Sequence, residues 1–326
     1  MNNGARPGLR RDVQGLRAVA VLIVVLNHLF AWPAGGFVGV DVFFVISGYL
    51  ITDLMLRERD RTGRVSWIDF YRRRVRRIIP TAVTVLVATV LVSRIIYPAV
   101  RARLIRQDAE WSAVFLSNWH FARVKTDYFN HEGLVSPLQH FWSLAVEEQF
   151  YLVWPVVVIA VSALVWRRAS YRRVLGVLIG VVVIADFGYS LQNSRAHATV
   201  AYFSTTARAW ELGVGALLAV SGRRLTRLSG WSRTPLAWCG LCGIAASLVL
   251  IAADSTFPAP WAALPVLSSG AVIAAGVGAP ARGLVVLTNP VSQYLGNVSY
   301  SLYCGIFRSS SCSGTSVPTG AYGALC

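Results

Sequence analysis

Long apolar runs alternate with short polar segments along almost the whole chain. Each run approaches the roughly 20 residues that a helix needs to cross the hydrocarbon core of a bilayer. The runs cover residues 16–33, 38–56, 79–100, 142–166, 174–189, 202–220, 236–253 and 261–279. The pattern therefore predicts an all-α protein, a polytopic bundle of about eight complete transmembrane helices and the start of a ninth.

The composition of the chain is typical of a membrane protein. Of the 326 residues, 55% are hydrophobic and only 14% are charged, which is too apolar for the surface of a soluble protein of this size. The formal net charge is +16. Because the arginines lie in short clusters between apolar runs, they indicate basic loops in contact with membrane lipids, and a nucleic-acid partner is not expected.

The distribution of arginine predicts an orientation. Basic clusters occupy residues 57–77, 167–173 and 223–233, whereas the alternate connections 34–37 and 254–260 contain no Lys or Arg. The clusters are therefore expected in the cytoplasm, with residues 1–15 as a cytoplasmic tail. The long segment 101–139, expected outside, carries five basic residues and is a weak exception. The first run follows basic residues as a signal peptide does, but without a clear cleavage site we interpret it as a retained helix.

Arg17 and His28 are ionisable groups within the first run. At 100° per residue, eleven positions place them about 20° from a common helical face and roughly 16 Å apart along the axis. Ionisable residues within a membrane indicate function by default. A simpler alternative is an arginine that snorkels to the interface and an isolated hydrogen-bonded histidine.

The second run begins with glycines, Asp41 and Ser47. Asp41 could orient an imidazole such as that of His28, or it could merely stabilise a helix start. Glu147 and Glu148 interrupt the fourth run. Because adjacent helical residues diverge by about 100°, we expect one glutamate to serve chemistry and the other to be structural.

Two further sets of ionisable residues contain arginine. Arg208 and Glu211 have helical contact spacing, which favours a self-neutralising pair. Arg73, Arg74, Arg76 and Arg77 form a dense cluster before the third run. Guanidinium groups bind phosphates, so this cluster could hold a coenzyme, or equally anchor the chain on anionic lipid. The sequence shows no glycine-rich phosphate loop and no metal-ligand spacing, and Cys239 and Cys242 lack a second ligand pair.

These segments resemble, in order and spacing, the acyltransferase-3 family of bacterial membrane acyltransferases. The resemblance covers about residues 10–303, and its matching segments are 14–17 with His28, 36–51, 70–80, 140–155, 208–216 and 295–303. It implies a multi-pass protein of the bacterial cytoplasmic membrane with residues 16–303 as its acyltransferase domain. Family members acylate peptidoglycan, lipopolysaccharide, exopolysaccharides and macrolide sugars, usually from acyl-coenzyme A.

The resemblance also implies roles for individual residues. His28 becomes the expected catalytic residue, as general base or acyl carrier, and we assign Glu148 and Asp41 to the catalytic group with it. Arg17 and the cluster of Arg73, Arg74, Arg76 and Arg77 would bind acyl-coenzyme A, a donor substrate rather than a tightly bound cofactor. The supporting residues would be Glu147, Ser47, Arg208 and Glu211. The acceptor would be a hydroxyl of a saccharide or glycolipid.

The resemblance stops after Tyr303. The family continues with Leu-Trp-His, an aromatic residue and proline, whereas this chain continues Cys304-Gly305-Ile306-Phe307-Arg308 and ends in a Ser- and Gly-rich segment. If codons for Cys304-Gly305-Ile306-Phe307-Arg308 are read one base earlier, they encode Leu-Trp-His, an aromatic residue and proline. We therefore predict that residues 304–326 are an out-of-frame tail on a truncated enzyme, which resequencing the locus would test. Loss of the last helices would then leave the chain unstable or inactive.

Two other classes of protein stay open at this level. In a transporter or flippase, the intramembrane Arg, His and Glu residues would line a substrate path. A membrane scaffold without catalytic activity would leave His28 unexplained. The arginine cluster aligned with the face of His28 favours the enzyme.

Overall fold

The computed structural model describes residues 10–124, 135–165, 168–252, 255–279, 281 and 283–306, with only the backbone described at 168–170. In these residues the regular structure is entirely helical, which confirms the predicted fold class. The helices are α1 Arg11–Phe30, η1 Gly36–Val38, α2 Gly39–Thr62, α3 Trp67–Ile96, α4 Ala99–Ala113, α5 Ser117–Arg123, α6 Phe141–Leu164, α7 Arg168–Ala196, α8 Ala198–Phe203, α9 Thr205–Val220, α10 Gly222–Leu225, α11 Gly230–Leu250, α12 Ala263–Ala275, α13 Val285–Thr288 and α14 Pro290–Cys304.

Among the described residues, six helices are long and apolar enough to cross a membrane: α1, α2 with the preceding η1, α3, α6, α7 and α11. The chain is thus a multi-pass membrane protein. The sixth and eighth apolar runs correspond to shorter helices, α9 with 16 residues and α12 with 13. Both fall short of the roughly 20 residues that a perpendicular span requires. The predicted count of eight spans is therefore supported for six of them and stays a prediction for the other two.

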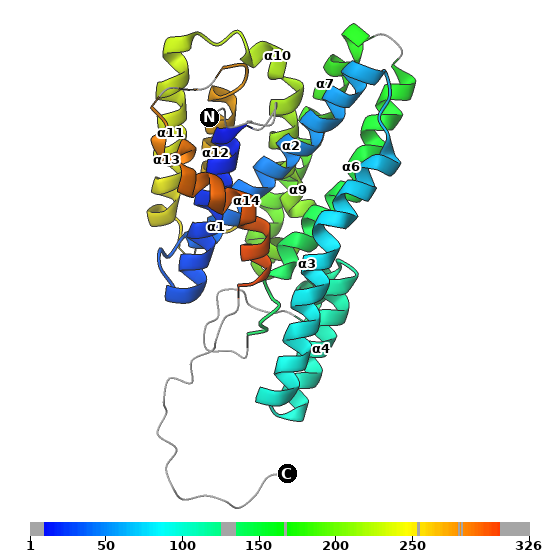
Figure 1. Ribbon diagram of the computed structural model, residues 1–326, viewed down its shortest axis with the longest axis vertical. Helices are drawn as coiled ribbons and strands as arrows, with labels where there is room; N and C mark the ends of the chain where they lie inside the picture. The colour runs from blue at the N-terminus through cyan, green and yellow to red at the C-terminus, as the bar shows by residue number, and fades with distance from the viewer. Residues whose placement is uncertain are drawn as a thin grey trace, which may run out of the picture.

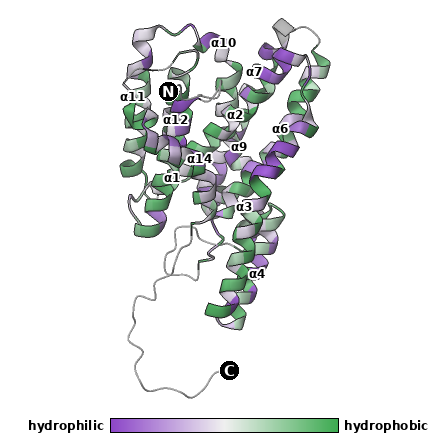
Figure 2. Cartoon of the chain, viewed as in Figure 1, coloured by the Kyte–Doolittle hydropathy of each residue, from purple (hydrophilic) through white to green (hydrophobic). Residues whose placement is uncertain are grey.

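Several helices extend beyond their apolar runs into the basic segments. α2 continues through Arg57, Arg59 and Arg61 and stops at Gly63, whose φ of 79° is left-handed and suits glycine. α3 begins at Trp67, so the cluster of residues 73–77 belongs to the same helix as the apolar run. Arginine is a good helix former, and polarity ends a membrane span without ending a helix. Figure 2 shows this on α3, which is hydrophilic in its first part and hydrophobic through the rest.

Glycines allow two pairs of helices to pack closely. A Cβ on Gly48 of α2 would lie 1.9 Å from the carbonyl oxygen of Leu212 on α9, and a Cβ on Gly215 would lie 2.0 Å from that of Val45. The same relationship joins α1 and α14, where a Cβ on Gly296 would lie 2.0 Å from the carbonyl oxygen of Gln14. Small residues at such crossings let helix backbones approach in a membrane. They let α2 pack against α9 and α1 against α14, near the centre of the molecule (Figure 1).

The basic segments of different helices meet at one end of the bundle. Asp60, near the end of α2, accepts a hydrogen bond of 2.6 Å from Arg172 of α7 and lies 3.6 Å from Arg223 of α10. The three arginine-rich connections thus lie on the same side of the molecule, as their common assignment to one face of the membrane requires. Which side of the membrane they face stays a prediction.

Candidate active site

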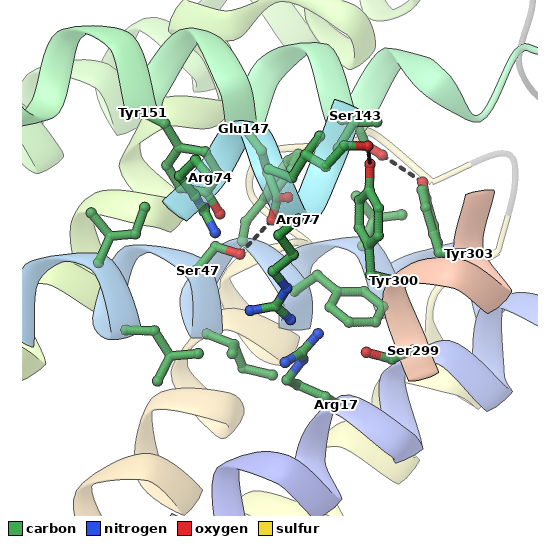
Figure 3. Close-up of a pocket in the computed structure, with 18 residues that line it drawn as sticks. Arg17, Ser47, Arg74, Arg77, Ser143, Glu147, Tyr151, Ser299, Tyr300 and Tyr303 are labelled. Carbon is green, nitrogen blue, oxygen red and sulfur yellow. Dashed lines mark hydrogen bonds between the residues drawn. The ribbon is translucent and has the colours of Figure 1, made fainter. Parts of the chain in front are cut away.

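A pocket lies where α1, α2, α3, α6 and α14 converge (Figure 3). It encloses about 770 Å³, including space that is open to the surroundings. Its polar lining consists of Arg17, Ser47, Arg74, Arg77, Ser143, Glu147, Tyr151, Ser299, Tyr300 and Tyr303, set among apolar side chains.

Three arginines give the pocket an excess of positive charge. Arg17 comes from α1, whereas Arg74 and Arg77 are three residues apart on α3 and so share one helical face. In Figure 3 the guanidinium groups of Arg17 and Arg77 point toward one another across the pocket. Glu147 is the one carboxylate in the described lining, so three positive charges face one negative charge. Such an arrangement suits a ligand with several negative charges, such as a phosphate ester.

Only half of the predicted arginine cluster lies in this pocket. Arg73 lies 3.7 Å from Glu58 of α2, and Arg76 is exposed; neither lines the pocket. The pocket thus brings together Arg74 and Arg77, and the expectation that all four arginines bind one ligand stays a prediction. Arg74 is also held in place, because its guanidinium carbon lies 3.6 Å from the centre of the Tyr151 ring, a cation–π contact.

The structure distinguishes the two adjacent glutamates of α6. Ser47 of α2 donates a hydrogen bond to Oε1 of Glu147, which lines the pocket. Glu148 follows about 100° further around the helix and is absent from the lining, and its buried Oε1 has no hydrogen-bond partner. The structure therefore places Glu147, and not Glu148, in the pocket lining, while the choice of Glu148 for chemistry and Glu147 for support stays a prediction.

Aromatic contacts connect the pocket with His28. The hydroxyl groups of Tyr303 and Ser143 share a hydrogen bond, and the Tyr303 hydroxyl also donates to the backbone oxygen of His140 over 3.2 Å. The ring of His140 lies edge-on to that of Tyr303 at 5.7 Å and to that of His28 at 6.4 Å. His28 is half-buried and does not line the pocket itself. It is therefore next to the pocket wall, separated from the cavity by His140 and Tyr303.

Sequence reasoning missed five residues of the pocket lining, Ser143, Tyr151, Ser299, Tyr300 and Tyr303, and also His140 beside the pocket wall. For α6, a usable pattern was present, because Ser143, Glu147 and Tyr151 are each four residues apart and share one face. The tyrosines of α14 had no comparable pattern. They reach the pocket through the packing of α14 on α1 and α3, where the hydroxyl of Tyr300 donates to the backbone oxygen of Ile78 over 3.2 Å.

Asp41 belongs to a second, fully buried cluster. Its Oδ1 lies 2.9 Å from Nη2 of Arg208, whose Nη1 lies 3.0 Å from Oε1 of Glu211. The expected pairing of Arg208 with Glu211 is thus confirmed. Asp41, however, ion-pairs with Arg208, which corrects the expectation that it orients His28. Four rings surround the guanidinium group at 5.2–5.6 Å, from Phe44, Trp142, Tyr202 and Phe257.

This cluster joins α2 to α9, since Asp41 is on α2 and Arg208 and Glu211 are on α9. Its position and complete burial indicate a structural role.

As for metals, no group of three or more His, Cys, Asp or Glu residues that could hold an ion occurs among the residues that the structure describes.

The fold and the pocket describe a multi-pass helical membrane protein with an arginine-rich pocket beside a histidine. Comparison with known proteins identifies the class. The family model of the acyltransferase-3 domain, described as an acyltransferase domain, matches residues 10–304. The chain therefore belongs to this family.

The chain is also similar to curated proteins that are named as O-acetyltransferases. It is 38% identical over 210 residues to the peptidoglycan O-acetyltransferase OatA of Listeria monocytogenes, covering 64% of this chain and 33% of that protein. It is 39% identical over 215 residues to the putative peptidoglycan O-acetyltransferase YrhL of Bacillus subtilis, covering 66% and 33%. The O-acetyltransferase OatA of Staphylococcus aureus is 38% identical over 221 residues, covering 65% and 34%. The matches span about a third of the length of these relatives. No solved structure matches the chain significantly.

Proposed function

We propose that this chain is the membrane domain of an O-acetyltransferase of the bacterial cytoplasmic membrane. It takes an acetyl group from acetyl-coenzyme A and passes it to a hydroxyl of a cell-wall saccharide, with peptidoglycan as the favoured acceptor. The relatives' names support the acetyl group and the acceptor. Family membership favours this reaction over the alternative of a transporter or flippase.

The observation that carries the donor assignment is the meeting of Arg17, Arg74 and Arg77 in one pocket. Coenzyme A carries several phosphate oxygens, and guanidinium groups bind such oxygens with charge-assisted hydrogen bonds. Arg74 and Arg77 are at the basic end of α3, which is predicted to face the cytoplasm, where acetyl-coenzyme A is made. In this proposal the phosphates bind there, and the thioester lies deeper, toward Glu147 and Tyr303.

His28 is the proposed group for acyl transfer. As a general base, its imidazole would take the proton of the saccharide hydroxyl while that oxygen bonds to the acyl carbon and the thiolate of coenzyme A leaves. As an acyl carrier, its imidazole would bond to the acyl carbon while the thiolate of coenzyme A leaves, and the saccharide hydroxyl would then bond to that carbon as the imidazole leaves and takes the hydroxyl proton. Both routes require His28 to lie near the pocket that holds the donor and also to be accessible to the saccharide from outside that pocket. The half-exposed position of His28, beyond His140 and Tyr303, agrees with this requirement.

The proposal is tested by transfer from radiolabelled acetyl-coenzyme A in membranes that contain the chain. Two versions are compared, the chain as given and a version restored to the alternative reading frame after Tyr303. His28→Ala is expected to lower acetyl transfer by about 10²-fold or more. The matched control is His197→Ala, because His197 is exposed before α8 and far in sequence from the pocket residues.

Equal acetyl transfer by the His28 variant and the parent would contradict the role of His28. If both versions are present in the membrane and neither transfers acetyl groups, the proposed donor is wrong. Activity in the restored version alone would support both the function and the out-of-frame tail.

A further inference from the structure

A second basic site lies at the same end of the bundle, outside the candidate active site. It is a groove between α7 and the α9–α10 corner, lined by Arg172 and Arg173 on one side and Arg223 and Arg224 on the other. It encloses about 1060 Å³, including space that is open to the surroundings. None of its lining residues lines the pocket at α1, α2, α3, α6 and α14.

The charges of this groove are only partly neutralised. Asp60 pairs with Arg172 at 2.6 Å and approaches Arg223 at 3.6 Å. Among the residues that the structure describes, Arg173 and Arg224 make no ion pair, and both are exposed. The Nε of Arg172 is buried without a hydrogen-bond partner. Of the four guanidinium groups, only those of Arg172 and Arg223 approach a carboxylate, and it is the same one, that of Asp60. This excess of positive charge favours an anion with several acceptor oxygens.

The floor of the groove is apolar and leads away along α7. Val177 belongs to the groove and is 63% exposed; Val181 and Ile184 are 60% and 74% exposed. With Val174, these residues recur at helical spacing and form one continuous apolar stripe on α7. Gly180 lies beside the stripe, and a Cβ there would meet nothing within 4 Å. The groove therefore combines a cluster of arginines with an exposed apolar surface that continues along α7.

We infer that this groove binds the phosphate headgroup of an anionic phospholipid, with an acyl chain of the lipid along the apolar stripe of α7. A free phosphate would satisfy the arginines but not use the stripe. The α7 helix is a candidate membrane span, and only 17% of its most apolar window is buried within the protein. Basic pockets at the cytoplasmic ends of membrane helices are a known setting for anionic lipid headgroups. The inference is independent of the proposed acetyl transfer.

The test uses the full chain purified in detergent, with phosphatidylglycerol as the probe. Its binding is followed as the rise in the midpoint of thermal unfolding and, separately, as lipid retained in native mass spectrometry. The double variant Arg173→Gln/Arg224→Gln is expected to lose most of the rise and most of the retained lipid. A loss of about fivefold in affinity is expected for each arginine removed.

A matched control separates a specific site from general attraction to arginine. Arg61→Gln/Arg64→Gln removes the same charge from the same end of the bundle, and both residues are exposed. This variant should keep the effect of phosphatidylglycerol. Phosphatidylcholine and inorganic phosphate should each give little effect on the parent chain.

Three results would overturn the inference. The first is equal loss of lipid binding in the two double variants, which would indicate a general charge effect. The second is an equal rise with phosphatidylcholine. The third is an equal rise with inorganic phosphate alone, which would make the groove a site for a soluble anion.

Discussion

Ser47 on α2 donates a hydrogen bond to Glu147 on α6, and this contact holds one particular carboxylate of an adjacent pair at the wall of the candidate active site. The bond joins two helices whose residues are 100 positions apart in sequence. It directs the side chain of Glu147 toward the three arginines, while Glu148 occupies a different face of α6. The consequences can be measured.

Glu147→Gln should reduce acetyl transfer far more than Glu148→Gln does. The first change removes the negative charge from the pocket, whereas the second acts outside its lining. If Glu147 moves or holds a proton during transfer, a loss of about 10²-fold or more is expected. Rates measured with radiolabelled acetyl-coenzyme A in membranes would show this, and a larger loss in the Glu148 variant would instead support Glu148 as the catalytic glutamate.

Arg74→Gln and Arg77→Gln should each raise the KM for acetyl-coenzyme A, because each removes a cation from the pocket. The expected loss in binding is about tenfold for a charge-assisted hydrogen bond. Arg73→Gln and Arg76→Gln are matched controls from the same turns of α3 that lie outside the lining. Steady-state kinetics of the four variants make the comparison. Equal effects at all four positions would favour a general electrostatic field over a defined phosphate site.

Gly48→Ala should destabilise the chain. The new Cβ would meet the carbonyl oxygen of Leu212 at 1.9 Å and force α2 away from α9. Overpacking of this kind costs about 1–3 kcal/mol. Gly188→Ala on α7 is the control, since a Cβ there meets nothing within 4 Å and alanine is the better helix former by roughly 0.5–1 kcal/mol. Thermal unfolding in detergent should therefore shift in opposite directions for the two variants.

Arg208→Leu should be among the most destabilising changes at a charged residue. It leaves Asp41 and Glu211 buried without their shared cation. Removing one partner of a buried ion pair typically costs about 3–5 kcal/mol. Arg106→Leu, which breaks an exposed pair with Glu110, should change stability little. The midpoints of thermal unfolding of the two variants provide the measurement. A small effect of Arg208→Leu would indicate that the carboxylates are already protonated or otherwise satisfied.

The fold class could be predicted because hydropathy is a local property. Each of the six long apolar helices was visible as a run of residues, and the arginines at their ends were visible as clusters. The ends of helices were less predictable. Arginine continues α2 and α3 beyond the apolar run, since the boundary of the hydrocarbon core is not the boundary of a helix.

Part of the candidate site was also predictable. Arg74 and Arg77 stood out as members of the dense arginine cluster before the third run. Arg17, Glu147 and Ser47 stood out because a charged or polar group within an apolar run is costly and needs a reason. His28 stood out for the same reason, and the structure places it beside the pocket wall.

The sequence by itself thus determined that the chain is a helical membrane protein, which segments are polar, and that its motifs resemble acyltransferases. Only the tertiary structure decided which polar residues share a cavity. Asp41 meets Arg208 on α9, and Tyr303 reaches the pocket because α14 packs on α1, where Gln14 donates to Asn297 across 283 residues of sequence. The physical reason is that a helical period fixes only the neighbours on one helix. Contacts between helices depend on where their glycines and side chains let them cross.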